Sequence, residues 1–200
     1  MTDQRSNSLR GRKLVVVDVE GNGQQPPEIV EIAALPIDDG QLGPATTWLV
    51  KPRKPINPIV TRKVHGIRNA DVVDQPSWAD VEAQVNTAIS GRVLVAHNAT
   101  VERGVLRAHL PGWEPSLVLD TLRLARHVWP GLGSYGLDHL TEHLALTADD
   151  IDGRRHRATY DAQLTWRLLN AALMASGATW NTLVDASALP GVAAPEDGLW

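Results

Sequence analysis

The chain has 200 residues, of which 43% are hydrophobic and 21% charged, with a net charge of −4 and no cysteine. This balance is typical of one globular domain without an overall basic surface for nucleic acid, and the lack of cysteine excludes disulfide frameworks, thiolate zinc sites and cysteine nucleophiles. The polar start of the sequence and the absence of a long apolar run lead us to expect a cytoplasmic protein without membrane contact.

Hydrophobic patterning predicts three strands in the first 50 residues. Apolar runs at 14–20, 28–37 and 46–50 have the length and composition of strands, and the turn signal DDG at 38–40 separates the second from the third. Because the connections between these strands are short, we expect an antiparallel meander.

The pattern changes to helical spacing after residue 76, where Ser77 is a candidate helix N-cap and Gly91 follows the end of that helix. We predict further strands at 92–97 and 117–119, and helices at 77–90, 101–110, 121–129, 136–144 and 158–175. An α/β fold with a mixed sheet and helices on both faces is therefore expected. Its domain spans 13–175, between a flexible arm at 1–12 and a loosely ordered tail at 176–200.

Two acidic residues, Asp18 and Glu20, stand at the end of the first predicted strand. Strand side chains alternate between faces, so both carboxylates point the same way, with Val16 behind them. The turn signal GNG at 21–23 places the pair at the mouth of the strand. The alternative is that Glu20 lies beyond the strand in water while Asp18 caps a turn.

Two further acidic residues begin predicted helices. Asp161 opens the apolar face of the helix at 158–175, and Glu102 lies in the first turn after the strand that runs into His97. Each acid could be a surface residue that the helix dipole favours. His156 lies in a Gly-Arg-Arg loop five residues before Asp161, where it either overhangs the same site or is simply solvated.

Taken together, these acids predict a metal site. Four carboxylates gathered at one sheet edge would repel one another unless cations neutralised them. Two divalent ions offset four negative charges, and oxygen ligands without cysteine suit two Mg²⁺ or Mn²⁺ ions. Two such ions about 3.5–4 Å apart form a clamp for phosphodiester hydrolysis.

At this point the sequence resembles the DEDDh 3′–5′ exonucleases, the group of the DNA polymerase III epsilon proofreading subunit, ribonuclease T and oligoribonuclease. The resemblance runs from about Leu14 to Leu169 and depends on the order and spacing of several motifs together. These are DVE at 18–20, IVEIAA at 29–34, VHGI at 64–67, HNA at 97–99, DTL at 120–122, SYGL at 134–137 and HRATYD at 156–161.

The resemblance implies a ribonuclease H-like fold that holds two Mg²⁺ or Mn²⁺ ions. Its metal ligands would be Asp18, Glu20 and Asp161, joined by Glu102, and His156 would be the general base that deprotonates the attacking water. Nucleoside 5′-monophosphates would leave one at a time from the 3′ end of a single strand.

The sequence departs from the family pattern at two positions. The second motif usually reads HNAxFD but here reads HNATVE, so Glu102 replaces an aspartate and extends the carboxylate by about 1.5 Å, one carbon–carbon bond. Gly21 stands where many members have threonine near the terminal nucleotide. These departures bear on how the metal and the 3′ end are held.

Several residues are candidates for binding the substrate. Arg154, Arg155 and Arg157 flank His156 and could meet backbone phosphates, which carry no base identity. The resemblance adds His65 and Asn98, which lie in two of the motifs, and Gly21, which directly follows DVE.

The expected partners are the 3′ ends of single-stranded DNA or RNA, with DNA favoured because the HGI segment resembles the proofreading branch. The tail has no clamp-binding motif to support association with a polymerase, and the oligomeric state stays open. The alternative function, motivated by Glu102, is a catalytically weakened member that acts as a nucleic-acid- or protein-binding module.

Overall fold

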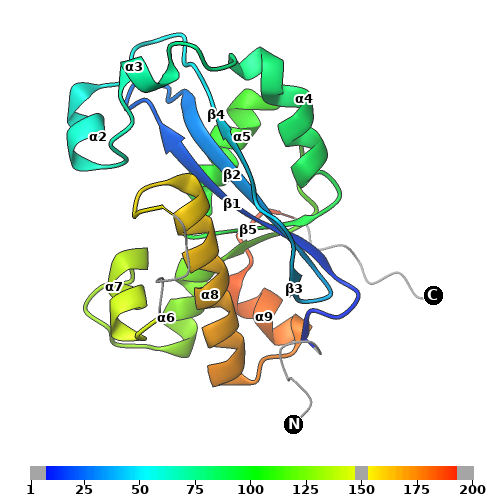
Figure 1. The fold of residues 1–200 in the computed structure, drawn as a ribbon. Helices are drawn as coiled ribbons and strands as arrows, with labels where there is room; N and C mark the ends of the chain where they lie inside the picture. Colours follow the sequence, from blue (N-terminus) through cyan, green and yellow to red (C-terminus); the bar gives the residue numbers. More distant parts are fainter. Residues whose placement is uncertain (1–7, 147–152, 193–200) are drawn as a thin grey trace.

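A six-stranded mixed sheet forms the centre of the computed structural model, which describes residues 8–146 and 153–192 (Figure 1). Its strands are β1 (Lys13–Gly21), β2 (Ile29–Asp38), β3 (Gln41–Leu42), β4 (Thr46–Leu49), β5 (Val93–Ala96) and β6 (Val118–Asp120). Strands β1, β2 and β4 agree with the predicted strands to within one residue at each end. The two-residue strand β3 was not predicted, because it is too short to show any alternation.

The pairing of the strands divides the sheet into an antiparallel half and a parallel half. Strand β2 pairs antiparallel with β1 on one side and with β3 and β4 on the other, which confirms the predicted meander. Strands β5 and β6 continue the sheet in parallel beside β1. Parallel neighbours need a crossover segment, and helices provide it here.

The helices of the described residues include the five predicted ones. They are α2 (Pro58–Lys63), α3 (Asn69–Val72), α4 (Trp78–Ile89), α5 (Thr100–His109), α6 (Thr121–Val128), α7 (Leu137–His143), α8 (Ala158–Ser176) and α9 (Trp180–Ser187). The five predicted helices are present as α4 to α8, whereas α2, α3 and α9 were not predicted. Ser77 caps α4 in a capping box with Asp80, as its position in the sequence predicts. Helix α8 ends at Gly177, which has the left-handed backbone (φ 61°) that glycine adopts most readily.

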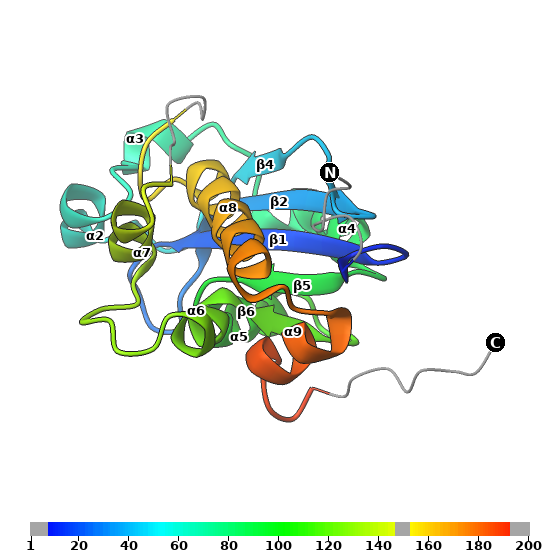
Figure 2. The ribbon, with the colours of Figure 1, turned by 90° about the horizontal axis from the view of Figure 1, so that it is seen from below.

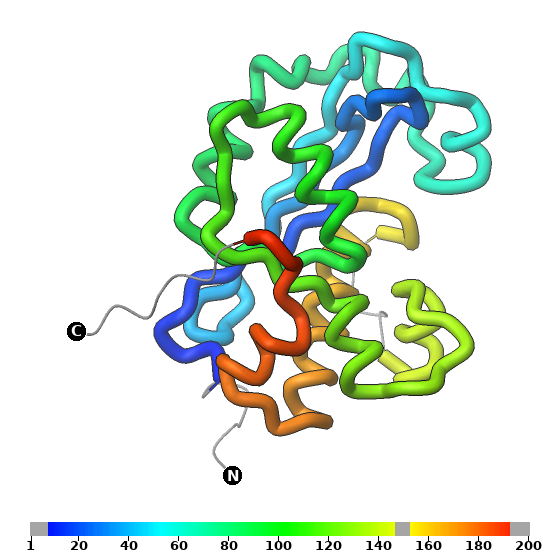
Figure 3. The backbone as a smooth tube through the Cα atoms, turned by 180° about the vertical axis from the view of Figure 1, so that it is seen from behind, coloured from blue at the N-terminus to red at the C-terminus, as the bar shows by residue number. Residues whose placement is uncertain are grey.

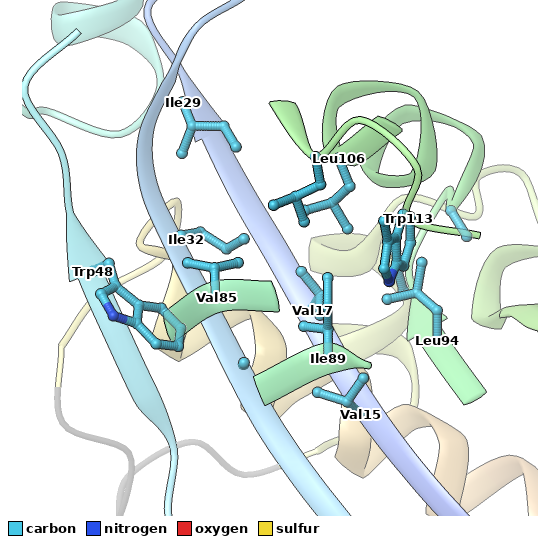
Figure 4. Packing of buried hydrophobic residues seen from close by; sticks show 14 of the residues in the cluster. Val15, Val17, Ile29, Ile32, Trp48, Val85, Ile89, Leu94, Leu106 and Trp113 are labelled. Carbon is cyan, nitrogen blue, oxygen red and sulfur yellow. The ribbon is translucent and has the colours of Figure 1, made fainter. Parts of the chain in front are cut away.

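The two faces of β1 are buried against different helices. Val15 and Val17 pack with residues of α4 and α5 in one core cluster (Figure 4). Leu14 and Val16 point to the opposite face and pack with residues of α6, α8 and α9. Figures 2 and 3 show α8 crossing one side of the sheet and α4 and α5 covering the other, so the predicted helices on both faces are confirmed. Asp18 continues the face that α8 covers.

Both ends of the described chain are more ordered than the sequence predicts. Leu9 is fully buried and the Ser8 hydroxyl donates a hydrogen bond to the Ala178 carbonyl, so residues 8–12 do not form a free arm. The predicted loose tail instead contains α9, whose Leu183 is fully buried, and the Leu189 N–H pairs with the Val118 carbonyl at the edge of β6. The remaining residues of the predicted arm and tail, 1–7 and 193–200, lie outside the described residues, and the domain boundaries stay a prediction.

None of the helices within residues 8–146 and 153–192 is both long enough and apolar enough to cross a membrane.

Candidate active site

Helix α8 crosses the sheet over β1 (Figure 2), and side chains from separate segments converge near the end of that strand. Glu20, His156 and Asp161 each place one ligand atom within 4.8 Å of the other two. The pairing register of β1 and β2 shifts between Glu20 and Gly21, a bulge of the kind that re-aims a side chain. The segments that carry these three residues were predicted to meet, and the structure brings them together.

Asp18 lies on the same face of β1 as Glu20 and is close to this group. Burial raises the pKa of Asp18 well above its usual value, and the nearby carboxyl groups of Asp161, Glu20, Glu102 and Glu31 raise it further. The side chain keeps intermediate exposure, so it is surrounded by protein without being sealed from solvent. The charged form of Asp18 is therefore destabilised unless a cation is present.

The pKa values of Glu20 and Asp161 are perturbed in the same direction. Burial raises the pKa of Glu20 to about 8, with a further contribution from Asp161. Burial likewise raises the pKa of Asp161 to about 6, although the neighbouring His156 lowers it in part. Both residues are only 8% exposed. Acids that are buried together in this way form the kind of site at which perturbed pKa values accompany function.

Glu102 reaches the same region from the first turn of α5. It is buried, and its Oε2 atom has no hydrogen-bond partner among the described residues. Burial raises the pKa of Glu102 to about 8, and Asp120 and Glu20 add to the shift. Within the described part of the chain, neither Glu102 nor Asp18 joins Glu20, His156 and Asp161 in a group as tight as 4.8 Å.

The donor set of this site fits a divalent cation. A buried carboxylate oxygen without a partner is costly, and a bound cation would remove that cost at Glu102 while offsetting the repulsion between Glu20 and Asp161. Carboxylate oxygens are the ligands that Mg²⁺ and Mn²⁺ prefer. The predicted cluster of acids is thus physically consistent with metal binding.

His156 adopts a left-handed backbone (φ 59°), an uncommon conformation for a residue other than glycine. Its N–H donates a hydrogen bond to Asp161 Oδ2 at 3.0 Å, which fixes the loop to the start of α8. The ring lies between two carboxylates, with Nδ1 4.0 Å from Asp161 and Nε2 3.9 Å from Asp138. The side chain is 45% exposed, so water can reach it.

Arg157 is paired with a buried acid while its side chain stays partly exposed. Its guanidinium makes a bidentate ion pair with Glu31, whose carboxylate also accepts the N–H of Ala158 at 2.9 Å. Glu31 is 3% exposed and lies opposite Glu20 in the β1–β2 pairing. Arg157 therefore has a structural role, which is to neutralise a buried acid beside Glu20, and its predicted contact with the substrate stays a prediction.

We predict that Arg157→Ala lowers the free energy of unfolding by about 3 kcal/mol, because it leaves the carboxylate of Glu31 buried and unpaired. Urea denaturation measures this change. The double variant Glu31→Gln/Arg157→Ala should recover part of the loss, since the buried group is then neutral. Equal losses in the single and double variants would contradict the assignment of this pair.

His65 is also placed differently from the prediction. It is fully buried, its Nδ1 accepts the N–H of Ile67, and its Nε2–H donates to the Gly21 carbonyl at 3.2 Å. Burial lowers the pKa of His65, which keeps the ring neutral. His65 thus ties the HGI loop to the end of β1 and is not exposed to a substrate.

The remaining residues that were predicted to contact the substrate differ in their exposure and in their partners. Asn98 is exposed, with a left-handed backbone (φ 65°) and an N–H bonded to Asp120 Oδ1, so its side chain is available at the site. Gly21 has partial exposure, and a methyl group there would make ordinary contacts with Pro27. Arg155 Nη1 lies 3.2 Å from Asp138 Oδ1, and both side chains are partly exposed.

Glu31 and Asp138 were missed as site residues. Glu31 is the single charged residue within the apolar sequence IVEIAA at 29–34, and a charge inside a buried strand is itself a signal of an internal partner. Asp138 lies in the first turn of α7, where an acid is common for electrostatic reasons alone, so its position does not single it out.

Comparison with known proteins identifies the family of this site. The model of the exonuclease family RNase_T matches residues 15–169. The chain is 34% identical to the 3′–5′ exonuclease DinG of Bacillus subtilis over 78% of its own length but only 17% of that protein. It is also 34% identical to exodeoxyribonuclease 10 of Escherichia coli, over 88% of this chain and 76% of that protein.

A solved structure agrees with these sequence matches. Exonuclease X in complex with 5′ overhanging duplex DNA superimposes with a TM-score of 0.72 and 33% identity, over 86% of this chain and 98% of the other. The fold, the arrangement of acids and the matched family model thus agree with the predicted resemblance. The chain belongs to the RNase_T family of DEDD-type 3′–5′ exonucleases.

Proposed function

We propose that this protein is a metal-dependent exonuclease that releases nucleoside 5′-monophosphates from the 3′ ends of single strands, with DNA favoured over RNA. The observation that carries the proposal is the convergence of Glu20, His156 and Asp161 at the end of β1, with Asp18 and Glu102 beside them. Buried acids that raise one another's pKa values are expected where divalent ions bind.

The acids divide naturally between ion binding and support. Asp18, Glu20, Asp161 and Glu102 would hold two Mg²⁺ or Mn²⁺ ions, which supply electrostatic stabilisation of charge at the scissile phosphate. The buried ion pair of Arg157 and Glu31 keeps the negative charge beside Glu20 from growing further.

His156 is suited to act as the general base. Its side chain is 45% exposed, so a water molecule can approach the ring, whose unprotonated nitrogen can accept a hydrogen bond and a proton from that water. The backbone bond to Asp161 holds His156 close to the proposed metal ligands. Asp138, near Nε2, would stabilise the imidazolium once the ring has accepted a proton.

The preference for DNA is supported by the relatives with the higher identities. One is named an exodeoxyribonuclease, and the matched structure at 33% identity was solved with a DNA duplex that has a 5′ overhang. A duplex of that form presents a recessed 3′ end, so such an end is a second DNA substrate to test.

The alternative, a weakened member that only binds, was motivated by Glu102 in place of aspartate. The burial of Glu102 and its unpartnered oxygen support a working ligand instead, because a binding module has no need of a buried acid beside Glu20. Enzyme and binder give different outcomes in one assay.

The test is a comparison of 5′-labelled DNA and RNA oligomers of one sequence, single-stranded or with a recessed 3′ end, incubated with Mg²⁺ or Mn²⁺. We expect a ladder that shortens from the 3′ end, faster on DNA, and that disappears with EDTA. Intact but retarded oligomers would instead establish the binding module, and faster decay of RNA would reverse the proposed preference.

A further inference from the structure

We propose that a pocket lined by three arginines beside the site binds a backbone phosphate of the nucleic-acid strand. This inference rests on the proposed function and names one of its subsites. The pocket has a volume of about 510 Å³. Its lining residues are Leu49, Gly66, Ile67, Arg68, Asp71, Arg154 and Arg157.

Arg154 is held directly against the HGI loop. Its Nη2 donates a hydrogen bond to the His65 carbonyl at 3.1 Å, and its guanidinium lies over the α-carbon of Gly66. A side-chain carbon at Gly66 would lie 2.0 Å from Nη2 and would displace this guanidinium, and the left-handed backbone there (φ 72°) also favours glycine. The arginine is exposed, and a guanidinium has five N–H donors, so most of its bonding capacity remains for a ligand.

The other two arginines are paired with acids, Arg68 at the surface and Arg157 with a buried carboxylate. Arg68 makes a two-pronged ion pair with Asp71, and Arg157 makes one with Glu31. Three guanidinium groups against these two carboxylates leave a net positive charge at the pocket. Because the two paired arginines are already ordered, little side-chain entropy is lost when an anion binds beside them.

The pocket adjoins the site through bonds already described. Arg154 lies two residues before His156 in the chain. The His65 ring donates a hydrogen bond to the carbonyl of Gly21, the residue after Glu20. Arg157 pairs with Glu31, the neighbour of Glu20 across the sheet. A strand whose 3′ end reaches the acids would therefore pass the arginines with a phosphate from further along its backbone.

A phosphodiester is the ligand that this chemistry fits. Arginine forks match phosphate oxygens, whereas an acidic cluster alone repels the substrate. A phosphate contact positions the strand without reading its bases. The pocket would thus contribute to the affinity for longer oligomers and not to the hydrolysis of a single nucleotide ester.

Three variants test this proposal, with Arg154→Ala removing the freest guanidinium and Asp71→Asn removing the acid that competes for Arg68. The side-chain oxygen of asparagine can still accept the Arg68 N–H, so α3 keeps its cap. Arg10→Ala is the matched control, because Arg10 is exposed before the first residue of β1, at the opposite end of that strand from Glu20.

Binding is measured by the fluorescence anisotropy of labelled oligothymidylate in EDTA over a range of salt concentrations. We expect Arg154→Ala to weaken binding about five- to tenfold and to reduce the log–log salt slope by about 0.7, the value for one phosphate on a single strand. Asp71→Asn should tighten binding about threefold, an effect that damage to the fold would not produce. Arg10→Ala should match wild type.

Hydrolysis separates this inference from the proposed function. With Mn²⁺, Arg154→Ala should lose at least five times more kcat/KM on the oligomer than on the p-nitrophenyl ester of thymidine 5′-monophosphate, which has no upstream phosphate. Equal losses on both substrates, or an unchanged salt slope, would overturn the phosphate pocket. A wild-type protein that hydrolyses neither substrate would overturn the proposed function instead, while the anisotropy result would still decide the pocket.

Discussion

Asp18→Asn is expected to reduce nucleotide release by about 10³-fold or more while raising the melting temperature of the metal-free protein. The loss follows because a neutral amide holds a divalent ion poorly, and about 4 kcal/mol of lost electrostatic stabilisation corresponds to this factor. The gain in stability follows because the charged form of Asp18 is opposed by burial and by the surrounding acids. The two measurements are the rate of ladder formation and a thermal melt in EDTA.

Asp38→Asn is the matched control for this prediction. Asp38 also lies on the central sheet, but Arg92 holds the pKa of Asp38 below its usual value through a hydrogen-bonded ion pair. The same chemical change should therefore lower the melting temperature slightly and leave the rate of nucleotide release unchanged. Wild-type rates in Asp18→Asn would refute its assignment as a metal ligand, whatever the melting temperatures.

How much of the fold could be predicted depends on how clear the hydrophobic pattern is in each element. Apolar runs mark β1 and β2, and apolar residues at helical spacing mark α8, so the bounds of these elements were predicted to within one residue. Helix α2 begins with the cap Asn57 and Pro58 but buries no residue of its own, and so it has no apolar stripe to detect. Helix α9 begins after the three residues 177–179 that follow α8, and the polar residues in it hid the buried Leu183.

The site was predictable to the extent that it depends on where elements end. Asp18 and Glu20 lie at the end of a strand and Asp161 at the start of a helix. These positions alone predicted that the three acids lie close together. The directions of Arg157 and His65 depend instead on Glu31 and Gly21, which are far from them in sequence. A pattern of residue types does not specify such partners, so the internal hydrogen bonds of Arg157 and His65 were not predicted.

The stability of the metal-free protein should fall as the pH rises from about 5 to 8. The pKa values of Glu20 and Glu102 are about 8 in the folded protein, against about 4.3 for glutamate in unfolded chains. Between these values the folded state binds protons that the unfolded state has released, so the free energy of unfolding decreases with pH. Each group contributes a slope of up to about 1.4 kcal/mol per pH unit, and Asp161, with a pKa of about 6, adds to it at the acidic end.

Magnesium should reverse this dependence, because the ion and the protons compete for the same oxygens. Urea denaturation in EDTA and in millimolar Mg²⁺, from pH 5 to 8.5, measures both curves. We expect the stabilisation by Mg²⁺ to be small at pH 5 and to grow with pH, since only the ionised carboxylates bind the ion. The double variant Glu20→Gln/Glu102→Gln should flatten the EDTA curve and lose most of the response to Mg²⁺. A metal-free stability that stays level or increases between pH 6 and 8 would mean that these acids are ionised without a cation, and the electrostatic reason for metal binding at this site would then be lost.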